Sequence, residues 1–253
     1  MEFTIEELER YNTMKVLAID TSNKPLSVAL LEEGQLVATT TTNIAKNHSV
    51  TLMPLIEELF KRANWQPQTV DRVVVAQGPG SYTGLRIGVT TAKTFACTLN
   101  KELVGVSSLE ILAGAFAHTE QLIVPLFDAR RNNVFAGGYS NKNGKLEQVI
   151  ADQHTSLDNL CDILQPYSKI IFVGKDCVLF KDQLLKKMGT SKISFAPQSF
   201  AYPQALVLGL LGEKKPIAEI NSFVPHYLRL TQAETQWLKN HRETDHEPYV
   251  EKI

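Results

Sequence analysis

The same order of predicted elements occurs twice along this chain of 253 residues, and the repetition limits the folds open to it. In each copy an apolar strand ends in an aspartate, and a hairpin, a helix and a strand that ends in a glycine follow. The paired positions are Asp20 and Asp128, the hairpin glycines Gly34 and Gly144, and the later glycines Gly78 and Gly174. One hairpin can recur by chance, whereas a whole ordered series is a stronger sign of repetition. The pattern therefore predicts a duplicated α/β unit with a mixed sheet in each half.

The expected elements follow from the spacing of apolar residues. The first half should contain a helix over 50–63, another over 89–97, and strands over 16–19, 26–31, 36–42 and 72–76. The second half should contain a helix over 157–164 and strands over 122–127, 134–139, 146–150 and 170–174. The expected divisions are an extension over 1–13, subdomains over 14–112 and 113–230, and a polar tail over 231–253.

A duplicated unit of this kind resembles the architecture shared by actin, sugar kinases and heat-shock ATPases. This is the actin-like (ASKHA, ribonuclease H-like) fold, in which two subdomains each carry a mixed sheet flanked by helices. In such proteins the first strand and the two hairpins face a nucleotide cleft. The fold alone does not establish that activity here.

Charge and cysteine content narrow the class of protein. With 26 basic and 27 acidic side chains, the chain has no global field that would recruit nucleic acid or an anionic membrane. Its three cysteines, Cys97, Cys161 and Cys177, lie in apolar or helical context, which favours buried thiols in a reducing compartment. No segment has the roughly 18–20 consecutive apolar residues of a membrane span, and the acidic N-terminus is unlike a signal peptide. A cytoplasmic protein without a membrane partner is expected.

A glycine-rich segment over 78–88 lies between a predicted strand and a predicted helix. Such a turn lets the backbone approach another group closely and points free helix N–H groups at it, as in many phosphate sites. The segment has neither GxxxxGK(S/T) nor the glycine spacing of a dinucleotide fingerprint. Close packing of the helix on the strand therefore remains open beside phosphate binding.

The run Asp20-Thr21-Ser22 also has two interpretations. Its carboxylate and hydroxyls could serve a metal-bound water and a phosphate, or the run could be an Asx or ST turn that closes the hairpin. The turn is favoured because no second acidic cluster or lysine supports the metal. The candidate nucleotide-facing residues are Asp20, Thr21, Ser22, Gly78, Gly80 and Asp128.

No catalytic constellation emerges from the sequence. The six histidines form neither HExxH nor a two-Cys, two-His spacing, which leaves zinc without support. Ser81 lacks the GxSxG nucleophile elbow and has no assigned base. No catalytic and no metal-ligating residue is predicted.

The apolar face of the predicted helix over 50–63 is wider than packing on one sheet requires. Most such helices bury this face in their own core, but a helical interface needs the same feature. The candidate interface residues are Leu52, Met53, Leu55, Ile56, Leu59, Phe60 and Ala63.

One segment of the chain is similar to the signature of the bacterial TsaB (YeaZ) family. The signature loop comprises Gly78, Pro79, Gly80, Ser81, Tyr82, Thr83, Gly84, Leu85 and Arg86. Segments over 18–22, 48–54, 106–110, 128–131 and 227–229 support the resemblance, which covers residues 14 to about 229.

The resemblance implies a non-catalytic scaffold. The family takes part in making the threonylcarbamoyl group on N6 of adenosine 37, in tRNAs that read codons beginning with A. Its paralogue TsaD performs the transfer, and TsaE is an ATPase that acts on the pair. TsaD carries a metal-binding HxxxH, where this chain has Ser108 and Leu112, which cannot act as imidazole ligands.

The resemblance also implies the partners. The helix over 50–63 and the helix after Gly88 should pack against TsaD, or against a second copy of this chain when TsaD is absent. Contact with tRNA should be indirect, through the complex. No cofactor should be required, although a weak or interfacial nucleotide stays open. The alternative is an ATP-binding kinase-like or peptidase-like enzyme, for which Asp20, the segment 78–88 and Asp128 would have to converge on a nucleotide.

Overall fold

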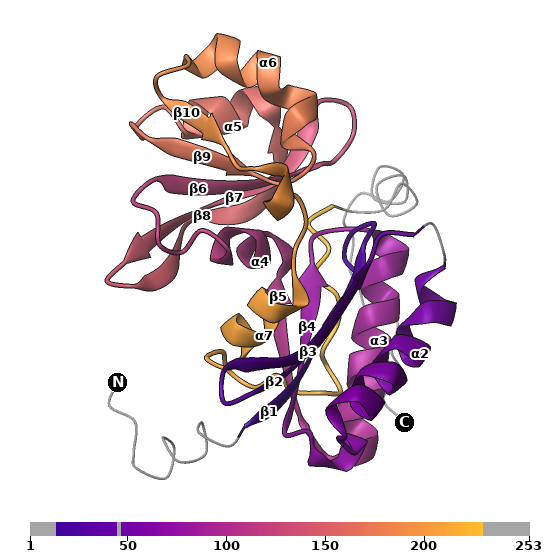
Figure 1. Ribbon diagram of the computed structural model, residues 1–253. Helices are drawn as coiled ribbons and strands as arrows, with labels where there is room; N and C mark the ends of the chain where they lie inside the picture. Colours follow the sequence, from indigo (N-terminus) through magenta and orange to yellow (C-terminus); the bar gives the residue numbers. More distant parts are fainter. Residues whose placement is uncertain (1–13, 45–46, 230–253) are drawn as a thin grey trace, which may run out of the picture.

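The computed structural model describes residues 14–44 and 47–229, which form two five-stranded mixed sheets (Figure 1). The first has the order β3-β2-β1-β4-β5, with β1 (Lys15–Asp20), β2 (Leu26–Glu32), β3 (Gln35–Thr42), β4 (Arg72–Gly78) and β5 (Glu102–Ser107). The second has the order β10-β9-β6-β7-β8, with β6 (Leu122–Asp128), β7 (Asn133–Lys142), β8 (Lys145–Ser156), β9 (Ile170–Val173) and β10 (Ile193–Phe195). In each sheet the first three strands along the chain pair antiparallel and the last two join in parallel. The predicted duplication is confirmed.

The two halves correspond at individual residues. The hairpin glycines Gly34 and Gly144 have φ of 72° and 77°, and Gly78 and Gly174 both have φ of 122°. All four lie in the left-handed region that disfavours a side chain, which explains why glycine recurs at matching points. The aspartates also match: the Oδ1 of Asp20 accepts from the Ser22 N–H at 2.8 Å, and the Oδ1 of Asp128 from the Arg130 N–H at 2.8 Å.

Helices cover both faces of the first sheet (Figure 1). Alternate side chains of a strand point to opposite faces, so Leu17 and Ile19 of β1 pack toward α2 (His48–Ala63) and α3 (Tyr82–Leu99). Val16 and Ala18 pack instead toward α4 (Ser108–Gly114) and α7 (Ala205–Gly212). On the second sheet, α5 (Leu157–Ile163) and α6 (Cys177–Met188) cover one core. Short 3-10 turns lie at η1 (Pro67–Thr69) and η2 (Gln198–Phe200).

The chain returns to the first sheet at α7. This helix packs on β1 and β2, and its close approach depends on small residues, because a Cβ on Gly212 would lie 2.2 Å from a methyl group of Val74. The buried guanidinium of Arg72 donates to the carbonyls of Gly212 and Glu213 at the C-terminal end of α7. The predicted second subdomain, residues 113–230, therefore includes a helix that lies on the first sheet. The divisions predicted at 1–13 and 231–253 lie outside the described residues.

A strap of residues 213–229 continues from α7 along the first half. Its Ala218 N–H donates to the carbonyl of Leu103 on β5, and its His226 N–H donates to the carbonyl of Gln77 on β4. The ammonium of Lys93 on α3 donates to the carbonyls of Asn221 and Phe223. These bonds carry residues 226–229 to the end of β4, where the two halves of the molecule meet.

The prediction of three buried thiols is wrong for one of them. Cys161 and Cys177 are buried, whereas Cys97 is exposed because it lies on the side of α3 that faces away from the sheet. Within the described residues, no helix is long and apolar enough to cross a membrane.

Candidate functional site

The glycine-rich segment after β4 is mostly helix, which corrects the expected signature loop. Gly78 ends β4 and Ser81 caps α3, its Oγ accepting from the Gly84 N–H at 3.3 Å. Residues 82–86 therefore belong to the first turns of α3, and only residues 79–81 link strand and helix. The expected helix over 89–97 begins seven residues earlier, at Tyr82. Gly84 and Gly88 lie inside this helix, where the lack of a side chain allows close packing, and they do not form a loop.

These glycines let α3 pack against the turn after β1. A Cβ on Gly84 would lie 2.1 Å from the carbonyl oxygen of Thr21, and one on Gly88 would lie 2.2 Å from the Thr21 hydroxyl. A Cβ on Gly80 would lie 2.2 Å from the carbonyl oxygen of Ser22. The Thr21 hydroxyl donates to the Gly84 carbonyl at 2.7 Å, and the Ser81 N–H donates to the Ser22 carbonyl at 2.7 Å. Of the two interpretations of the segment, this geometry favours close packing.

The run Asp20-Thr21-Ser22 is buried beneath α3. Asp20 is 2% exposed, and Thr21 and Ser22 are fully buried. Burial raises the pKa of the Asp20 carboxyl, although hydrogen bonds from Ser22 act in the opposite direction. Its Oδ2 has no hydrogen-bond partner within the described part of the chain. The Asx turn is present, since Oδ1 accepts from the Ser22 N–H.

A cleft of about 490 Å³ lies where the two halves meet. Its walls come from the start of α3, the β6–β7 turn and the strap: Pro79, Gly80, Tyr82, Leu85, Asp128, Ala129, Arg130, Arg131, Phe135, His226, Tyr227, Leu228 and Arg229. Of the candidate nucleotide-facing residues, Gly80 and Asp128 line this cleft. Asp20, Thr21, Ser22 and Gly78 do not line it, so the structure divides the predicted set.

The β6–β7 turn has an unusual backbone. Three successive residues without glycine, Arg130, Arg131 and Asn132, have φ of 72°, 54° and 58°. Each costs about 1 kcal/mol or more relative to right-handed backbone, so the surroundings must hold the turn in place. The Ala129 N–H donates to the Asn133 carbonyl and the Asn133 N–H to the Arg130 carbonyl, at 2.9 and 3.0 Å. The turn thereby presents two exposed arginines at the cleft.

Aromatic and cationic side chains meet on the opposite wall. The rings of Tyr82 and Tyr227 stack with centroids 4.9 Å apart and planes 27° apart. The guanidinium of Arg86 lies 5.3 Å from the Tyr82 ring centroid and donates to its hydroxyl at 2.9 Å. Arg229 on the strap donates to the Ala129 carbonyl at 3.0 Å and so joins the strap to the β6–β7 turn.

Known proteins are similar to this chain in sequence and in fold. The model of the family described as "TsaD: tRNA N6-adenosine threonylcarbamoyltransferase" matches residues 36–237. The "tRNA threonylcarbamoyladenosine biosynthesis protein TsaB" of Bacillus subtilis is 43% identical over 231 residues, which cover 90% of this chain and all of that protein. The chain belongs to the TsaB family.

Two further comparisons concern a more distant relative and the fold. A tRNA N6-adenosine threonylcarbamoyltransferase of Anaeromyxobacter dehalogenans is 35% identical over 112 residues, which cover 38% of this chain and 34% of that protein. The solved structure of YeaZ from Pseudomonas aeruginosa has a TM-score of 0.70 at 23% identity, and covers 85% of this chain and all of YeaZ. The fold is shared with YeaZ, and the expected duplicated α/β fold with a mixed sheet in each half is confirmed.

Helix α4 carries the two positions at which the resemblance puts TsaD's histidines. In this TsaB-family chain Ser108 is fully buried and Leu112 is 2% exposed, so both side chains belong to the interior. The hydroxyl of Ser108 has no hydrogen-bond partner among the described residues. No group of three or more His, Cys, Asp or Glu side chains suited to a metal occurs within residues 14–44 and 47–229.

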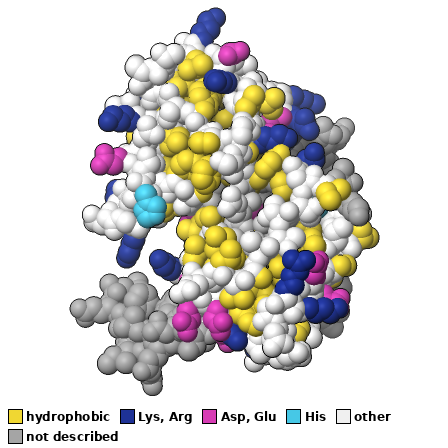
Figure 2. Space-filling model, viewed as in Figure 1, with side chains coloured by type: hydrophobic (Ala, Val, Ile, Leu, Met, Phe, Trp, Pro, Cys, Tyr) yellow, Lys and Arg dark blue, Asp and Glu magenta, His cyan; other side chains and the backbone are white. Residues whose placement is uncertain are grey.

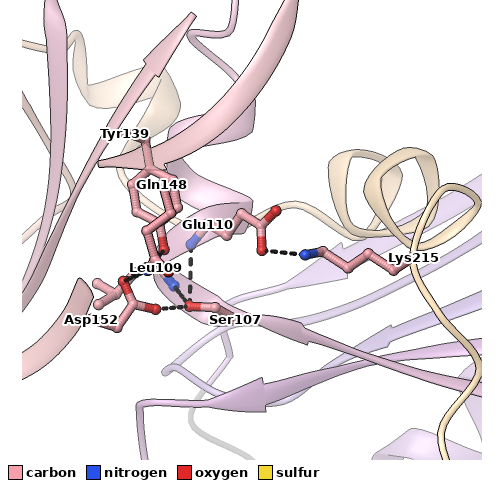
Figure 3. Close-up of polar contacts among 7 residues, drawn as sticks. All are labelled: Ser107, Leu109, Glu110, Tyr139, Gln148, Asp152 and Lys215. Carbon is pink, nitrogen blue, oxygen red and sulfur yellow. Dashed lines mark hydrogen bonds and ion pairs between the residues drawn. The ribbon is translucent and has the colours of Figure 1, made fainter. Parts of the chain in front are cut away.

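A polar network holds the start of α4 (Figure 3). Ser107 accepts from the N–H groups of Leu109 and Glu110, at 3.2 and 3.3 Å, and its hydroxyl donates to Asp152 on β8. Tyr139 on β7 donates to the other oxygen of Asp152 at 2.6 Å. Nearby, Glu110 pairs with Lys215 of the strap at 2.9 Å. The network therefore ties β5 and α4 to the second sheet.

The candidate interface residues of α2 divide by burial. Leu52, Ile56, Leu59 and Phe60 are buried in this chain's own core, and Leu55 and Ala63 are half-buried against it. Leu52 and Leu59 fill the space between α2, α3 and the sheet, whereas Ile56 and Phe60 also line a groove at the surface of α2. Met53 is 53% exposed and is the most exposed member of the set.

A groove of about 740 Å³ runs beside Met53, between α2, α3 and the loop after α2. Pro54, Phe60, Trp65 and Phe95 supply its apolar lining, and Phe60 stacks parallel to Phe95 at 6.1 Å. On its rim, Lys61 pairs with Glu57 on the same helix. In Figure 2, hydrophobic side chains lie between basic and acidic ones in the lower half of the molecule, over helix α2. Apolar lining with a charged rim is typical of protein interfaces.

Sequence reasoning missed Tyr227, Arg229, Tyr139 and Asp152 as site or network residues. The first two lie in a segment without regular structure that reaches the cleft from about 100 positions away along the chain. The one sequence feature that drew attention to Tyr227 and Arg229 was the resemblance of residues 227–229 to the family.

Proposed function

We propose that this chain is the non-catalytic partner of a TsaD-type threonylcarbamoyltransferase. In this role it supports formation of N6-threonylcarbamoyladenosine at adenosine 37 of tRNAs that read ANN codons. The observation that carries the proposal is 43% identity to a protein named for threonylcarbamoyladenosine biosynthesis, over the whole length of that protein. The match to the TsaD family model over residues 36–237 supports descent from a common ancestor with the transferase.

The absence of catalysis is argued from α4. A serine and a leucine occupy the two positions that the family resemblance assigns to metal-binding histidines, and neither side chain ligates a transition metal as imidazole does. Both are packed in the interior. Thr21 and Ser22, whose hydroxyls are the candidates for binding phosphate, are buried under α3. These features support a scaffold rather than an ATP-dependent or peptidase-like enzyme.

The partner surface is assigned to the groove between α2 and α3. Its apolar lining would gain about 25 cal/mol for each Å² removed from water, and the charged rim would orient the partner. TsaD is the proposed occupant in the complex, TsaE the proposed ATPase on the pair, and a second copy of this chain the occupant when TsaD is absent. A cytoplasmic location and a weak or interfacial nucleotide remain predictions.

The test is co-purification of this chain with the TsaD of the same organism, using an exposed position of the groove. Met53→Arg places a charge in the groove, whereas Leu179→Arg places one on α6, where the leucine is 64% exposed. Met53→Arg should weaken the complex by about tenfold or more, since a desolvated unpaired charge is costly. Leu179→Arg should leave it unchanged.

The functional readout is threonylcarbamoylation of tRNA in vitro with purified chains. Modification should require both chains, and Met53→Arg should lower the rate in proportion to the complex that it removes. A chain that modifies tRNA without TsaD, or a TsaD that needs no second chain, would refute the proposal. ATP turnover by this chain alone, lost in Asp20→Ala, would support the enzyme alternative instead.

A further inference from the structure

We infer that residues 1–13 of this chain bind in the apolar groove beside Met53, and that a partner has to displace them in order to bind there. The displacement rests on the proposed function, which assigns this groove to TsaD or to a second copy of the chain. The groove itself, the point at which residues 1–13 join the fold and their own sequence all favour this occupant.

Residues 1–13 join the fold beside one end of the groove. The carbonyl of Met14 accepts from the Glu33 N–H at 3.2 Å, which fixes this point of the chain to the first sheet. The ammonium of the next residue, Lys15, lies 4.8 Å from the centroid of the Trp65 ring. Because Trp65 lines the groove, the segment starts next to the groove's aromatic end.

The groove is short enough for this segment to cover. Its lining runs along α2 from Met53 to Asn64, which is about 17 Å at the rise of a helix. A stretch of 13 residues reaches at most about 45 Å when extended and about 20 Å as a helix. Either form, attached beside Trp65, is long enough to reach Met53.

The sequence of the segment has the pattern of a short amphipathic helix. Thr4 and Glu7 have the spacing of a capping box. Phe3 and Leu8, which flank the same predicted helix start, have the spacing of a hydrophobic staple. A helix that begins there carries Ile5 and Leu8 on one face, since they are three positions apart. The sequence therefore predicts an apolar helix face within reach of the groove.

The groove offers apolar surface to such a face. Phe60 stacks on Phe95, and Pro54 and Trp65 complete the apolar lining. Met53 at the same groove is 53% exposed. Covering these side chains removes apolar surface from water, which is favourable. A short tether holds its own ligand at an effective concentration in the millimolar range, so even weak binding fills the groove in the free chain.

The polar tail over 231–253 is a less suitable occupant because it starts elsewhere. It follows Arg229, which donates to the Ala129 carbonyl at the cleft. Tyr82 of α3 lines this cleft, whereas Phe95 of the same helix lines the groove, about 20 Å further along the axis. The tail thus begins far from the groove, and residues 1–13 begin beside it.

The direct test is methyl NMR of isotope-labelled methionines in the full chain. Ile5→Glu combined with Leu8→Glu should release the segment and shift the methyl signal of Met53, which Met53→Leu identifies. The matched control is Arg10→Glu, which changes the charge by the same two units on the opposite helix face and should leave the signal in place. Met188, buried in the second half, should keep its signal in both variants.

Release of the segment should also strengthen the binding of TsaD. If residues 1–13 fill the groove in about nine molecules of ten, the Ile5 and Leu8 variant should bind TsaD about tenfold more tightly, and Arg10→Glu should not. A synthetic peptide of residues 1–13, added to the released variant, should return the Met53 signal toward its natural position and weaken TsaD binding. The peptide experiment tests the groove without relying on the substitutions alone.

An unmoved Met53 signal in the Ile5 and Leu8 variant would overturn the inference. So would a Met53 signal that changes on dilution, which would identify a second copy as the occupant. A shift caused by Trp237→Glu with Leu238→Glu would assign the groove to the tail instead.

The two proposals can fail separately. A Met53 shift without any change in TsaD affinity would overturn the displacement and leave the proposed function intact. Failure of the natural chain and the released variant to bind TsaD would refute the proposed function. The Met53 signal needs only this chain, so it still decides whether residues 1–13 bind in the groove.

Discussion

The Tyr139 hydroxyl on β7 donates a 2.6 Å hydrogen bond to the carboxylate of Asp152 on β8, beside the start of α4 (Figure 3). Tyr139 is 1% exposed, and burial together with the adjacent carboxylate raises the pKa of its phenol. The phenol therefore stays protonated and donates at neutral pH. Because Ser107 donates to the other oxygen of Asp152, this one carboxylate joins the two halves.

Tyr139→Phe should lower the free energy of unfolding by about 1.5–3 kcal/mol, since it removes a buried hydrogen bond to a charged group. Urea denaturation measures the change. The control is Tyr167→Phe, where the hydroxyl takes part in none of the hydrogen bonds found between described residues. Equal loss in the two variants would mean that the Asp152 bond contributes nothing beyond the hydroxyl itself.

Gly84→Ala should destabilise the first half by about 3 kcal/mol, because the new methyl group would lie 2.1 Å from the Thr21 carbonyl oxygen. A backbone carbonyl in a buried turn cannot move aside as a flexible side chain can. Thr83→Ala, at the exposed neighbouring position, is the control and should change stability little. An alanine at position 84 that preserves the unfolding midpoint would contradict the packing described for α3.

Asp20→Asn should change how stability depends on pH. Burial raises the folded-state pKa of Asp20 above its ordinary value of 3.8, so the folded state holds this proton more tightly than the unfolded state. The stability of the natural chain therefore falls as pH rises from about 3.8 and levels off above the folded-state pKa. The variant lacks this decline, so its stability relative to the natural chain should rise across the same window. Urea midpoints over a pH series test this, and a pH-independent difference would contradict it.

One thiol of three should react rapidly in the folded protein. Burial raises the pKa of the Cys177 thiol to about 12 and also raises that of Cys161, which suppresses the reactive thiolate. Cys97 is exposed. A chromogenic disulfide reagent should therefore release one equivalent quickly, and Cys97→Ser should abolish that phase. Full reaction of three thiols should appear only in denaturant.

The duplication was predictable because it depends on local rules. Gly34 and Gly144 are required at hairpin turns with positive φ, and Gly78 and Gly174 at strand ends with φ of 122°. Aspartates that accept from the N–H two residues later recur for a similarly local reason. Such requirements are visible in a sequence without knowledge of any distant contact.

What the apolar face of a helix packs against could not be predicted in the same way. The width of the α2 stripe does not say whether Leu52 and Ile56 meet a sheet, a second helix or another protein. In the structure α3 packs beside α2 and covers the extra width. The cleft was hidden for a related reason, since Arg229 reaches Ala129 across 100 positions of sequence.

The return of α7 to the first sheet has a consequence for biosynthesis. All five strands of that sheet have left the ribosome once Ser107 has emerged, yet Ala205 and Leu208, which cover Val16 and Ala18, are still to be made. The nascent chain thus holds a sheet whose apolar face is covered only in part, by α4, while most of the second half is translated. Chaperone engagement should concentrate in this interval and end when α7 docks.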